Sequence, residues 1–236
     1  MSGPIQSIDL NADLGEGYPN DAALLARVTS ASVSCGAHAG DRAAILATLR
    51  EAKARGVSIG AHPGFADREG FGRRERDVAA AEVERLILEQ IEALAALALE
   101  VGLPLRFVKP HGALYNQAQR QPRVAEGVIA ALARLHLPVL GQPRSVLEAR
   151  AKAQGVRFVA EGFPERRYRP DGRLVPRDEE GAVLTDPDEI EAQVVWLIEQ
   201  GIATLCIHGD DPHAVEKADR VRAVLRRHRI APKSFV

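Results

Sequence analysis

The sequence has few of the features that mark a secreted, membrane-spanning or nucleic-acid-binding protein. Only two of its 236 residues are cysteine, too few for a disulfide framework, so both thiols are expected to be reduced. The net charge is −1 and the charges are interspersed, so no basic surface for nucleic acid or an anionic membrane is expected. The longest apolar run, residues 93–99, is too short to span a bilayer. The N-terminus lacks a basic segment followed by an apolar core, so no export signal is expected, and we predict a cytoplasmic protein.

Two common nucleotide-binding motifs are also missing. The chain contains no Gly-x-x-x-x-Gly-Lys-Ser/Thr loop and no Gly-x-Gly-x-x-Gly after a predicted strand. If the protein uses ATP, it does not bind the nucleotide through either motif. The remaining composition, 46% hydrophobic and 27% charged, is that of an ordinary globular protein, and the length suits one domain over residues 1–236.

Short apolar stretches alternate with helical patterns along the chain. The expected strands are 5–10, 31–35, 57–61, 105–108, 137–140, 156–160 and 203–207. The expected helices are 21–28, 42–55, 78–101, 122–135, 145–154, 187–200 and 211–228, with Asp41, Asp77 and Asp186 as caps. A small hairpin is expected over 167–177, around a Pro-Asp-Gly turn. Regular alternation of strand and helix predicts a parallel sheet with right-handed crossovers.

The polar motifs decide between an open and a closed sheet. They directly follow six of the seven expected strands. An open, doubly wound sheet gathers its ligands at one switch point, whereas every strand of a barrel ends at the same mouth. We therefore predict an α/β fold with a seven-stranded (β/α) barrel.

Four of the seven histidines, His38, His62, His111 and His208, come just after expected strands. A single histidine at such a position is a packing residue as often as a functional one, but four at equivalent positions predict a shared site. Asp13, His38 and His62 would suit zinc, manganese or a similar divalent metal. No short ligand spacing supports a metal, so a metal-free hydrogen-bond network is an equal alternative.

Lys109 follows a buried strand and is expected to hold an anionic group or to stabilise developing negative charge, although it could simply pair with a carboxylate. Asp13 and Glu16 are candidate general bases, because a carboxylate in a closed mouth can have a raised pKa. Glu16 could instead cap the following turn. Arg73 and Arg74 suit carboxylate or phosphate recognition, with a solvated loop of mixed charge as the alternative. The two cysteines are expected to be small buried residues rather than nucleophiles.

Seven motifs, running in order over nearly the whole chain, resemble the LamB/YcsF family. They lie at residues 9–17, 35–41, 60–64, 70–74, 108–116, 174–177 and 208–210. The resemblance implies a barrel of the glycoside hydrolase/deacetylase type and the ATP-dependent opening of 5-oxo-L-proline (pyroglutamate) to L-glutamate, in complex with 5-oxoprolinase subunits B and C. ATP would be a co-substrate, with the partner subunits as one place for it. Ser32, Ser34 and Ala37 depart from the family pattern, as does Phe-Pro-Glu-Arg at 163–166, where the family has Phe-Ala-Asp-Arg.

The residues then expected to act fall into two sets. The expected catalytic residues are Asp13, Glu16, His38, Lys109, His111, His208 and Asp210. The expected substrate-binding residues are Asn11, Asp41, Arg73, Arg74 and Tyr115. Two other functions compete with lactam opening: a metal-dependent, ATP-independent deacetylase of a carbohydrate or small amide, and a non-catalytic metabolite-binding subunit.

Overall fold

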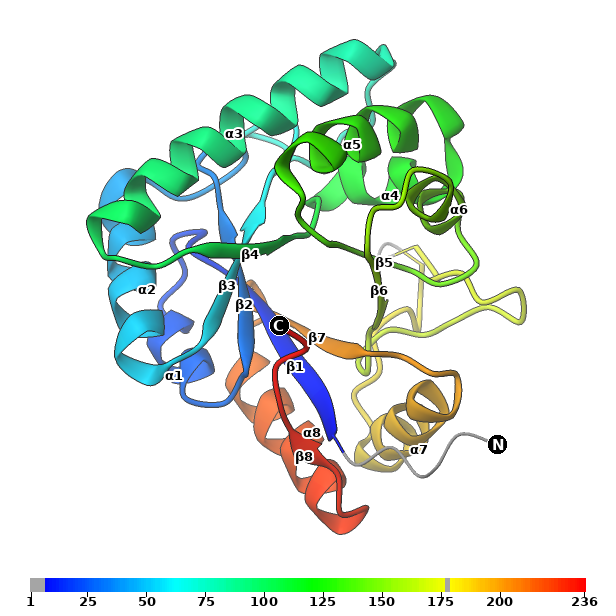
Figure 1. The fold of residues 1–236 in the computed structure, drawn as a ribbon. Coiled ribbons are helices and arrows are strands. Elements are labelled where there is room, and N and C mark those ends of the chain that lie inside the picture. Colours follow the sequence, from blue (N-terminus) through cyan, green and yellow to red (C-terminus); the bar gives the residue numbers. More distant parts are fainter. Residues whose placement is uncertain (1–6, 177–178) are drawn as a thin grey trace.

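A computed structural model describes residues 7–176 and 179–236, and seven parallel strands close into a barrel with helices around its outer surface (Figure 1). The strands are β1 (Ser7–Leu14), β2 (Ser30–Ser34), β3 (Ser58–His62), β4 (Leu105–Val108), β5 (Val139–Gly141), β6 (Phe158–Gly162) and β7 (Thr204–His208). Each strand pairs with the next along the chain, and β1 pairs with both β2 and β7. The predicted seven-stranded α/β barrel is therefore confirmed.

Eight helices are present in the described part of the chain. They are α1 (Asp21–Leu25), α2 (Arg42–Arg55), α3 (Ala80–Glu100), α4 (Gly112–Arg120), α5 (Pro122–Leu135), α6 (Val146–Ala153), α7 (Pro187–Glu199) and α8 (Ala214–Arg227). Two predicted caps are confirmed, since Asp41 accepts from the Ala44 amide and Asp186 from the first-turn amides of α7. The predicted Asp77 cap is wrong, because α3 begins after Ala79 without a side-chain cap. Helix α4, which opens on a glycine, was not predicted.

Four strands, β3, β5, β6 and β7, begin later than the apolar pattern predicts, and for the first three the preceding helix explains why. The amides of Val57, Leu137 and Val156 donate to the carbonyls of residues five positions earlier, at the ends of α2, α5 and α6. This bond and an apolar residue just past a left-handed one are typical of a Schellman helix end. These three apolar residues therefore end helices rather than begin strands.

The barrel interior is polar along β1. Along β1 the residues Ile8, Leu10, Ala12 and Leu14 belong to the core beneath the helices. The alternate residues face inward, since Asn11 contacts Glu161 on β6 and Asp13 contacts Lys109 just after β4, neither of which neighbours β1 in the sheet. Alternation along a strand places one set of side chains on each face.

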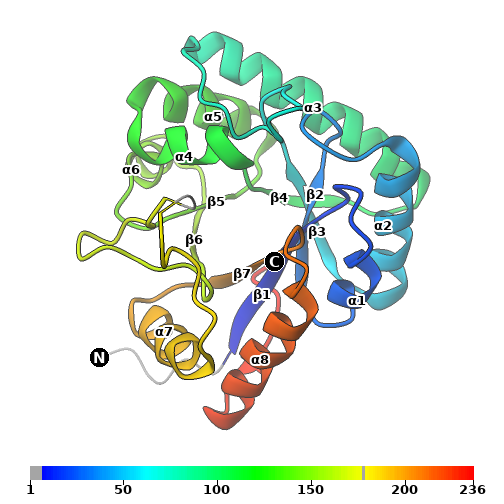
Figure 2. The ribbon, with the colours of Figure 1, turned by 180° about the vertical axis from the view of Figure 1, so that it is seen from behind.

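The C-terminal segment closes the end of the barrel where the strands begin. Strand β8 (Ala231–Pro232), which was not predicted, pairs with the start of β1. Beyond it Phe235 packs on Phe107, Leu140 and Val159, and the C-terminus lies over the barrel axis in both views (Figures 1 and 2). This end is therefore filled by side chains, which leaves the opposite end for the polar motifs.

The long segment between β6 and α7 contains two antiparallel bridges, Tyr168 with Leu174 and Arg166 with Val183. The Tyr168–Leu174 bridge agrees with the hairpin predicted over 167–177, although Arg177 lies outside the described residues. Residues 5 and 6, predicted to begin the first strand, also lie outside the described residues. No helix in the described part of the chain is long and apolar enough to cross a membrane.

Candidate functional site

Lys109 lies at the centre of a buried charge cluster at the open end of the barrel. Its ammonium is 2.9 Å from Asp13 Oδ1, 2.8 Å from Glu161 Oε1 and 2.9 Å from Cys206 Sγ. We call Asp13, Lys109, Glu161 and Cys206 the lysine cluster. All four come from different strands or strand ends, and all are buried. The barrel therefore holds a cation where its strands end.

The pKa values show how the lysine cluster shares its charges. Burial disfavours the Lys109 ammonium, but the nearby carboxylates outweigh it and raise the pKa of Lys109 well above its usual range. Burial also disfavours ionised Asp13, yet Lys109 lowers the pKa of Asp13 below its ordinary value. The pKa of Glu161 is raised by burial, which Lys109 only partly opposes. One ammonium thus keeps Asp13 ionised while Glu161 holds its proton more tightly.

Beside this cluster lie Glu16, His38, His62 and His111, which we call the histidine cluster. One ligand atom from each residue lies within 4.8 Å of those of the others. Glu16 Oε1 is 3.1 Å from His38 Nε2 and 3.4 Å from His111 Nδ1, and the His38 and His111 rings stack at 3.8 Å. This set differs from the predicted metal ligands in containing Glu16 and His111. Asp13 lies at its edge, 3.6 Å from His62 Nε2, and pairs with Lys109 instead.

Backbone carbonyls fix the tautomers of two of these histidines. His62 Nδ1 is 2.7 Å from the Lys109 carbonyl oxygen, and His111 Nε2 is 2.8 Å from the Phe71 carbonyl oxygen. A carbonyl oxygen only accepts, so each of these nitrogens carries the hydrogen of the neutral ring. The remaining nitrogens, His62 Nε2 and His111 Nδ1, then face each other 2.9 Å apart with a lone pair each.

Protonation of the rings would relieve this contact, but the environment opposes it. Burial lowers the pKa of His62 well below its usual range and lowers the pKa of His111 and of His38 to about 4. Burial raises the pKa of Glu16 to about 8, a shift that His111 opposes and the Asp13 charge supports. Protonated Glu16 has one hydrogen to donate, which cannot satisfy the lone pairs of both His62 Nε2 and His111 Nδ1. The histidine cluster therefore fits a cation, with each fixed ring donating its other N–H to a carbonyl as metal-binding histidines commonly do.

His208, at the end of β7, pairs with Glu165. Its Nδ1 is 2.6 Å from Glu165 Oε1, and its ring stacks on Phe163 with centroids 5.4 Å apart. It also brings a ring nitrogen to within 4.8 Å of Asp13 and Cys206 ligand atoms. The predicted His208 thus lies beside the lysine cluster.

The loop after β3 covers the histidine cluster. Phe71 adopts a left-handed φ of 54°, which directs its carbonyl to His111, and Gly112 lies so close to this loop that an added Cβ would come within 2.6 Å of the Gly72 oxygen. The Arg73 guanidinium pairs with Asp210 across the mouth. This arginine is 44% exposed and therefore able to meet an incoming anion.

The other predicted residues have mixed positions. Asn11 lies inside the barrel, donating to Glu161 and Thr204, and Tyr115 lies buried beside Glu161. Arg74 instead faces solvent and pairs with Asp67, and Asp41 caps α2 on the surface. These last two lie outside both clusters.

Sequence reasoning missed Glu161 and Glu165. The apolar pattern predicts that the sixth strand ends one residue before Glu161, so this carboxylate is expected in a loop rather than inside the barrel. Burial raises the pKa of the Cys35 thiol to about 12 and that of Cys206 well above its usual range, in keeping with the expectation that neither is a nucleophile.

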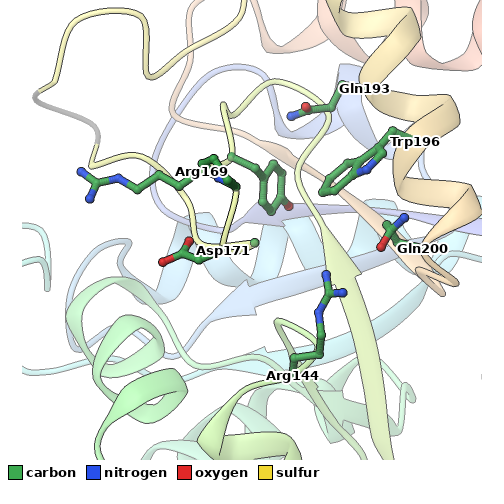
Figure 3. Close-up of a pocket in the computed structure, with 9 residues that line it drawn as sticks. Arg144, Arg169, Asp171, Gln193, Trp196 and Gln200 are labelled. Atoms are coloured by element: carbon green, nitrogen blue, oxygen red, sulfur yellow. The ribbon is translucent and has the colours of Figure 1, made fainter.

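A separate cavity of about 590 Å³ lies on the flank of the barrel, where Trp196 of α7 faces Arg144 and the loop around Arg169 (Figure 3). The residues that line it belong to neither cluster. Tyr168 connects its wall to the mouth, since the tyrosine hydroxyl accepts from the Phe163 amide.

Comparison with known proteins agrees with this architecture. The family model described as "LamB/YcsF family" matches residues 8–236. The chain belongs to the LamB/YcsF family. A protein of Paracidovorax citrulli (strain AAC00-1), whose name describes it as the A subunit of 5-oxoprolinase, is 47% identical over 251 residues, which cover 97% of this chain and 99% of the relative.

Two solved structures share the fold. The lactam utilization protein from Thermus thermophilus has a TM-score of 0.89 and 40% sequence identity, covering 97% of this chain and all of that one. A family 4 carbohydrate esterase from Streptomyces lividans has a TM-score of 0.53 and 10% sequence identity, and the match covers 99% of this chain and 95% of the esterase chain. The second likeness concerns the fold alone, and it agrees with the predicted deacetylase type of barrel.

Proposed function

We propose that this chain is the A subunit of an ATP-dependent 5-oxoprolinase, which opens the lactam of 5-oxo-L-proline to L-glutamate. The observation that carries the proposal is the 47% identity, over almost the full length of both chains, to a protein named as the A subunit of 5-oxoprolinase. Ring opening needs a cation near the carbonyl oxygen, a base for water and a proton donor for the leaving nitrogen. The barrel mouth supports the proposal because it contains residues suited to these roles.

The lysine cluster supplies two of these groups. Lys109 is a buried, fixed ammonium, which can stabilise the negative charge carried by the phosphorylated lactam oxygen. Asp13 stays ionised beside it and can accept a proton from water. Arg73, at the rim, can receive the carboxylate of 5-oxoproline in exchange for Asp210.

The histidine cluster would hold a divalent metal through Glu16, His38, His62 and His111. When bound there, such an ion supplies a Lewis acid and a bound water of lowered pKa. The residues themselves orient the site, because the carbonyls of Lys109 and Phe71 hold His62 and His111 in the tautomers that leave a lone pair toward its centre.

ATP and the partner subunits complete the proposal. Transfer of the terminal phosphate of ATP to the lactam oxygen, with ADP leaving, would remove amide resonance and make the carbonyl carbon a better electrophile. Ring opening by water then leaves an acyl phosphate, which a second water hydrolyses to glutamate and inorganic phosphate. Since the sequence lacks the two common nucleotide motifs, we place the ATP step in an assembly with 5-oxoprolinase subunits B and C. We further propose that residues 1–236 act as one domain in the cytoplasm.

The test is glutamate release from 5-oxoproline by this chain with its B and C partners, with and without ATP and after chelation. We expect release only with ATP and all three chains. His111→Ala should abolish it, whereas the matched surface variant His228→Ala should not, and both should assemble normally. Full activity of His111→Ala would overturn the site assignment.

The cation-fitting histidine cluster also favours one alternative, a metal-dependent deacetylase. That function predicts ATP-independent acetate release from a carbohydrate or small amide, and loss of the activity on chelation. Binding of 5-oxoproline without turnover, under any combination of partners, would instead indicate a metabolite-binding subunit.

A further inference from the structure

We propose that Glu165 is the positioning residue for His208, and that the pair delivers a proton to the leaving nitrogen of the lactam. This inference deepens the proposed function and rests on it. It rests on a contact between two residues that belong to neither cluster: the buried carboxylate of Glu165 lies 2.6 Å from Nδ1 of His208, at the end of β7.

Glu165 is held firmly in place although it lies in a loop. Its carbonyl accepts from the Leu184 amide at 2.8 Å, and the neighbouring Phe163 amide donates to the Tyr168 hydroxyl at 2.9 Å. Only 3% of Glu165 is exposed. A rigid, buried carboxylate can fix the orientation of a ring that hydrogen-bonds to it.

A buried lysine stands behind the carboxylate. Lys217 Nζ is 3.6 Å from Glu165 Oε2 and 2.5 Å from Asp211 Oδ2. Its positive charge favours the ionised form of Glu165, which then accepts the hydrogen of His208 Nδ1. The stacked Phe163 ring restrains the same imidazole from its face. Carboxylate and aromatic ring together set both the tautomer and the plane of His208.

This arrangement suits an acid at the leaving nitrogen. With Nδ1 donating to Glu165, Nε2 is the position at which His208 exchanges a proton with substrate. As the lactam C–N bond breaks, its electron pair stays on nitrogen, which takes the proton from Nε2 of the imidazolium. His208 is left neutral, and the proton that water loses to the base on attack restores it over the cycle. Glu165 stays ionised throughout.

Glu165→Gln separates positioning from simple packing. Lysine only donates, so the new amide oxygen should turn to Lys217 and the NH₂ group to His208 Nδ1. The ring would then carry its hydrogen on Nε2 and accept from the amide at Nδ1, so the imidazolium that delivers the proton would no longer form readily. We expect kcat for glutamate formation to fall by roughly 10²- to 10³-fold, with KM changed less than about threefold. Glu165→Asp should restore most of the activity, and Glu189→Gln on the surface of α7 should match the wild type.

The second measurement is ¹⁵N NMR of the histidine rings in the full chain, with His208 assigned from a His208→Gln spectrum. We expect the Nδ1–H tautomer in the wild type and in Glu165→Asp, and the Nε2–H tautomer in Glu165→Gln. An unchanged tautomer, or an unchanged kcat with only a lowered Tm, would overturn the inference. If the wild-type complex opens no lactam, the proposed function fails, while the NMR result still decides whether Glu165 positions His208.

Discussion

The two ends of the barrel surround a buried aspartate with different partners. Asp9 and Asp13 both lie on the inward face of β1, four residues apart and buried. At the closed end Asp9 accepts hydrogen bonds from Thr29 and Ser30 at 2.7 Å and from Thr204 at 2.5 Å. At the open end Asp13 faces the Lys109 ammonium. The difference is one of neutral against charged partners.

This difference separates a structural carboxylate from one poised for chemistry. Burial raises the pKa of Asp9, and three hydroxyl groups only partly oppose the shift. Lys109 outweighs burial at Asp13 and lowers its pKa instead. The closed end satisfies its polar groups and fills the axis with aromatic rings, whereas the open end leaves facing lone pairs in the histidine cluster. A buried polar group without a suitable partner requires an explanation, and a catalytic role or a bound ion provides one.

The largest effect should follow removal of the cation at the open end. Lys109→Met leaves Asp13 and Glu161 facing each other without a counter-charge. We expect glutamate formation to fall by about 10³-fold or more, and the free energy of unfolding to fall by about 3–5 kcal/mol. Steady-state assays and urea denaturation measure the two effects. Lys152→Met, on the surface of α6, is the control, and an active Lys109→Met enzyme would contradict the role of the lysine cluster.

A comparable loss of stability at the closed end should leave the chemistry intact. Phe107→Ala opens a cavity among Leu140, Val159 and Phe235, which should lower the free energy of unfolding by about 3–5 kcal/mol. Below the melting temperature, kcat should stay within about threefold of the wild type. A collapse of kcat in the folded variant would show that the two ends are not independent.

Metal affinity should distinguish the histidine cluster from the rest of the mouth. We expect calorimetric titration with Zn²⁺ or Mn²⁺ to detect one site. His62→Ala should weaken binding by about 10- to 100-fold or more, because it removes a proposed ligand, while Asp9→Asn should not change it. Such weakening would show that a cation explains the facing lone pairs of His62 and His111. Equal metal binding by wild type and His62→Ala would argue for a metal-free network instead.

The smallest effect concerns the pH dependence of stability. The pKa of Asp9 is raised above its ordinary value of 3.8, so the folded state holds this proton more strongly than the unfolded state. Its contribution to stability is complete below pH 3.8 and is lost as pH rises through the folded pKa. Asp9→Asn removes this loss, so its free energy of unfolding relative to the wild type should increase from about pH 3.5 to about pH 7. A constant difference across that range, measured by urea denaturation, would show that Asp9 does not titrate as described.

The sequence allowed the barrel and most of its mouth to be predicted, because the signals are local. Strand and helix patterns, and polar residues directly after strands, predicted where Asp13, His62 and Lys109 would lie. Helix ends were harder, since Val57, Leu137 and Val156 have apolar side chains that suit a strand, yet their amides close the preceding helices. Local pattern cannot separate these two uses of an apolar residue.

The missed residues depend on contacts between distant segments. Glu161 reaches Lys109 only because β6 extends two residues past its predicted end, and Glu165 reaches His208 because its loop folds back over the end of β7. The short β8 exists only through its pairing with β1. Arg74 and Asp41 show the reverse case, in which suitable residue types in matching motifs point to the surface.

The catalytic role of the open end is tested by comparing Asp13→Asn with Asp9→Asn, the same change at the two ends of one strand. Both variants would be assayed for glutamate release from 5-oxoproline with the B and C partners and ATP, at a temperature where circular dichroism shows both folded. We expect Asp13→Asn to lose at least about 10²-fold in kcat and Asp9→Asn to stay close to the wild type. Equal activities of the two variants would contradict the claim that the open end alone is the catalytic centre.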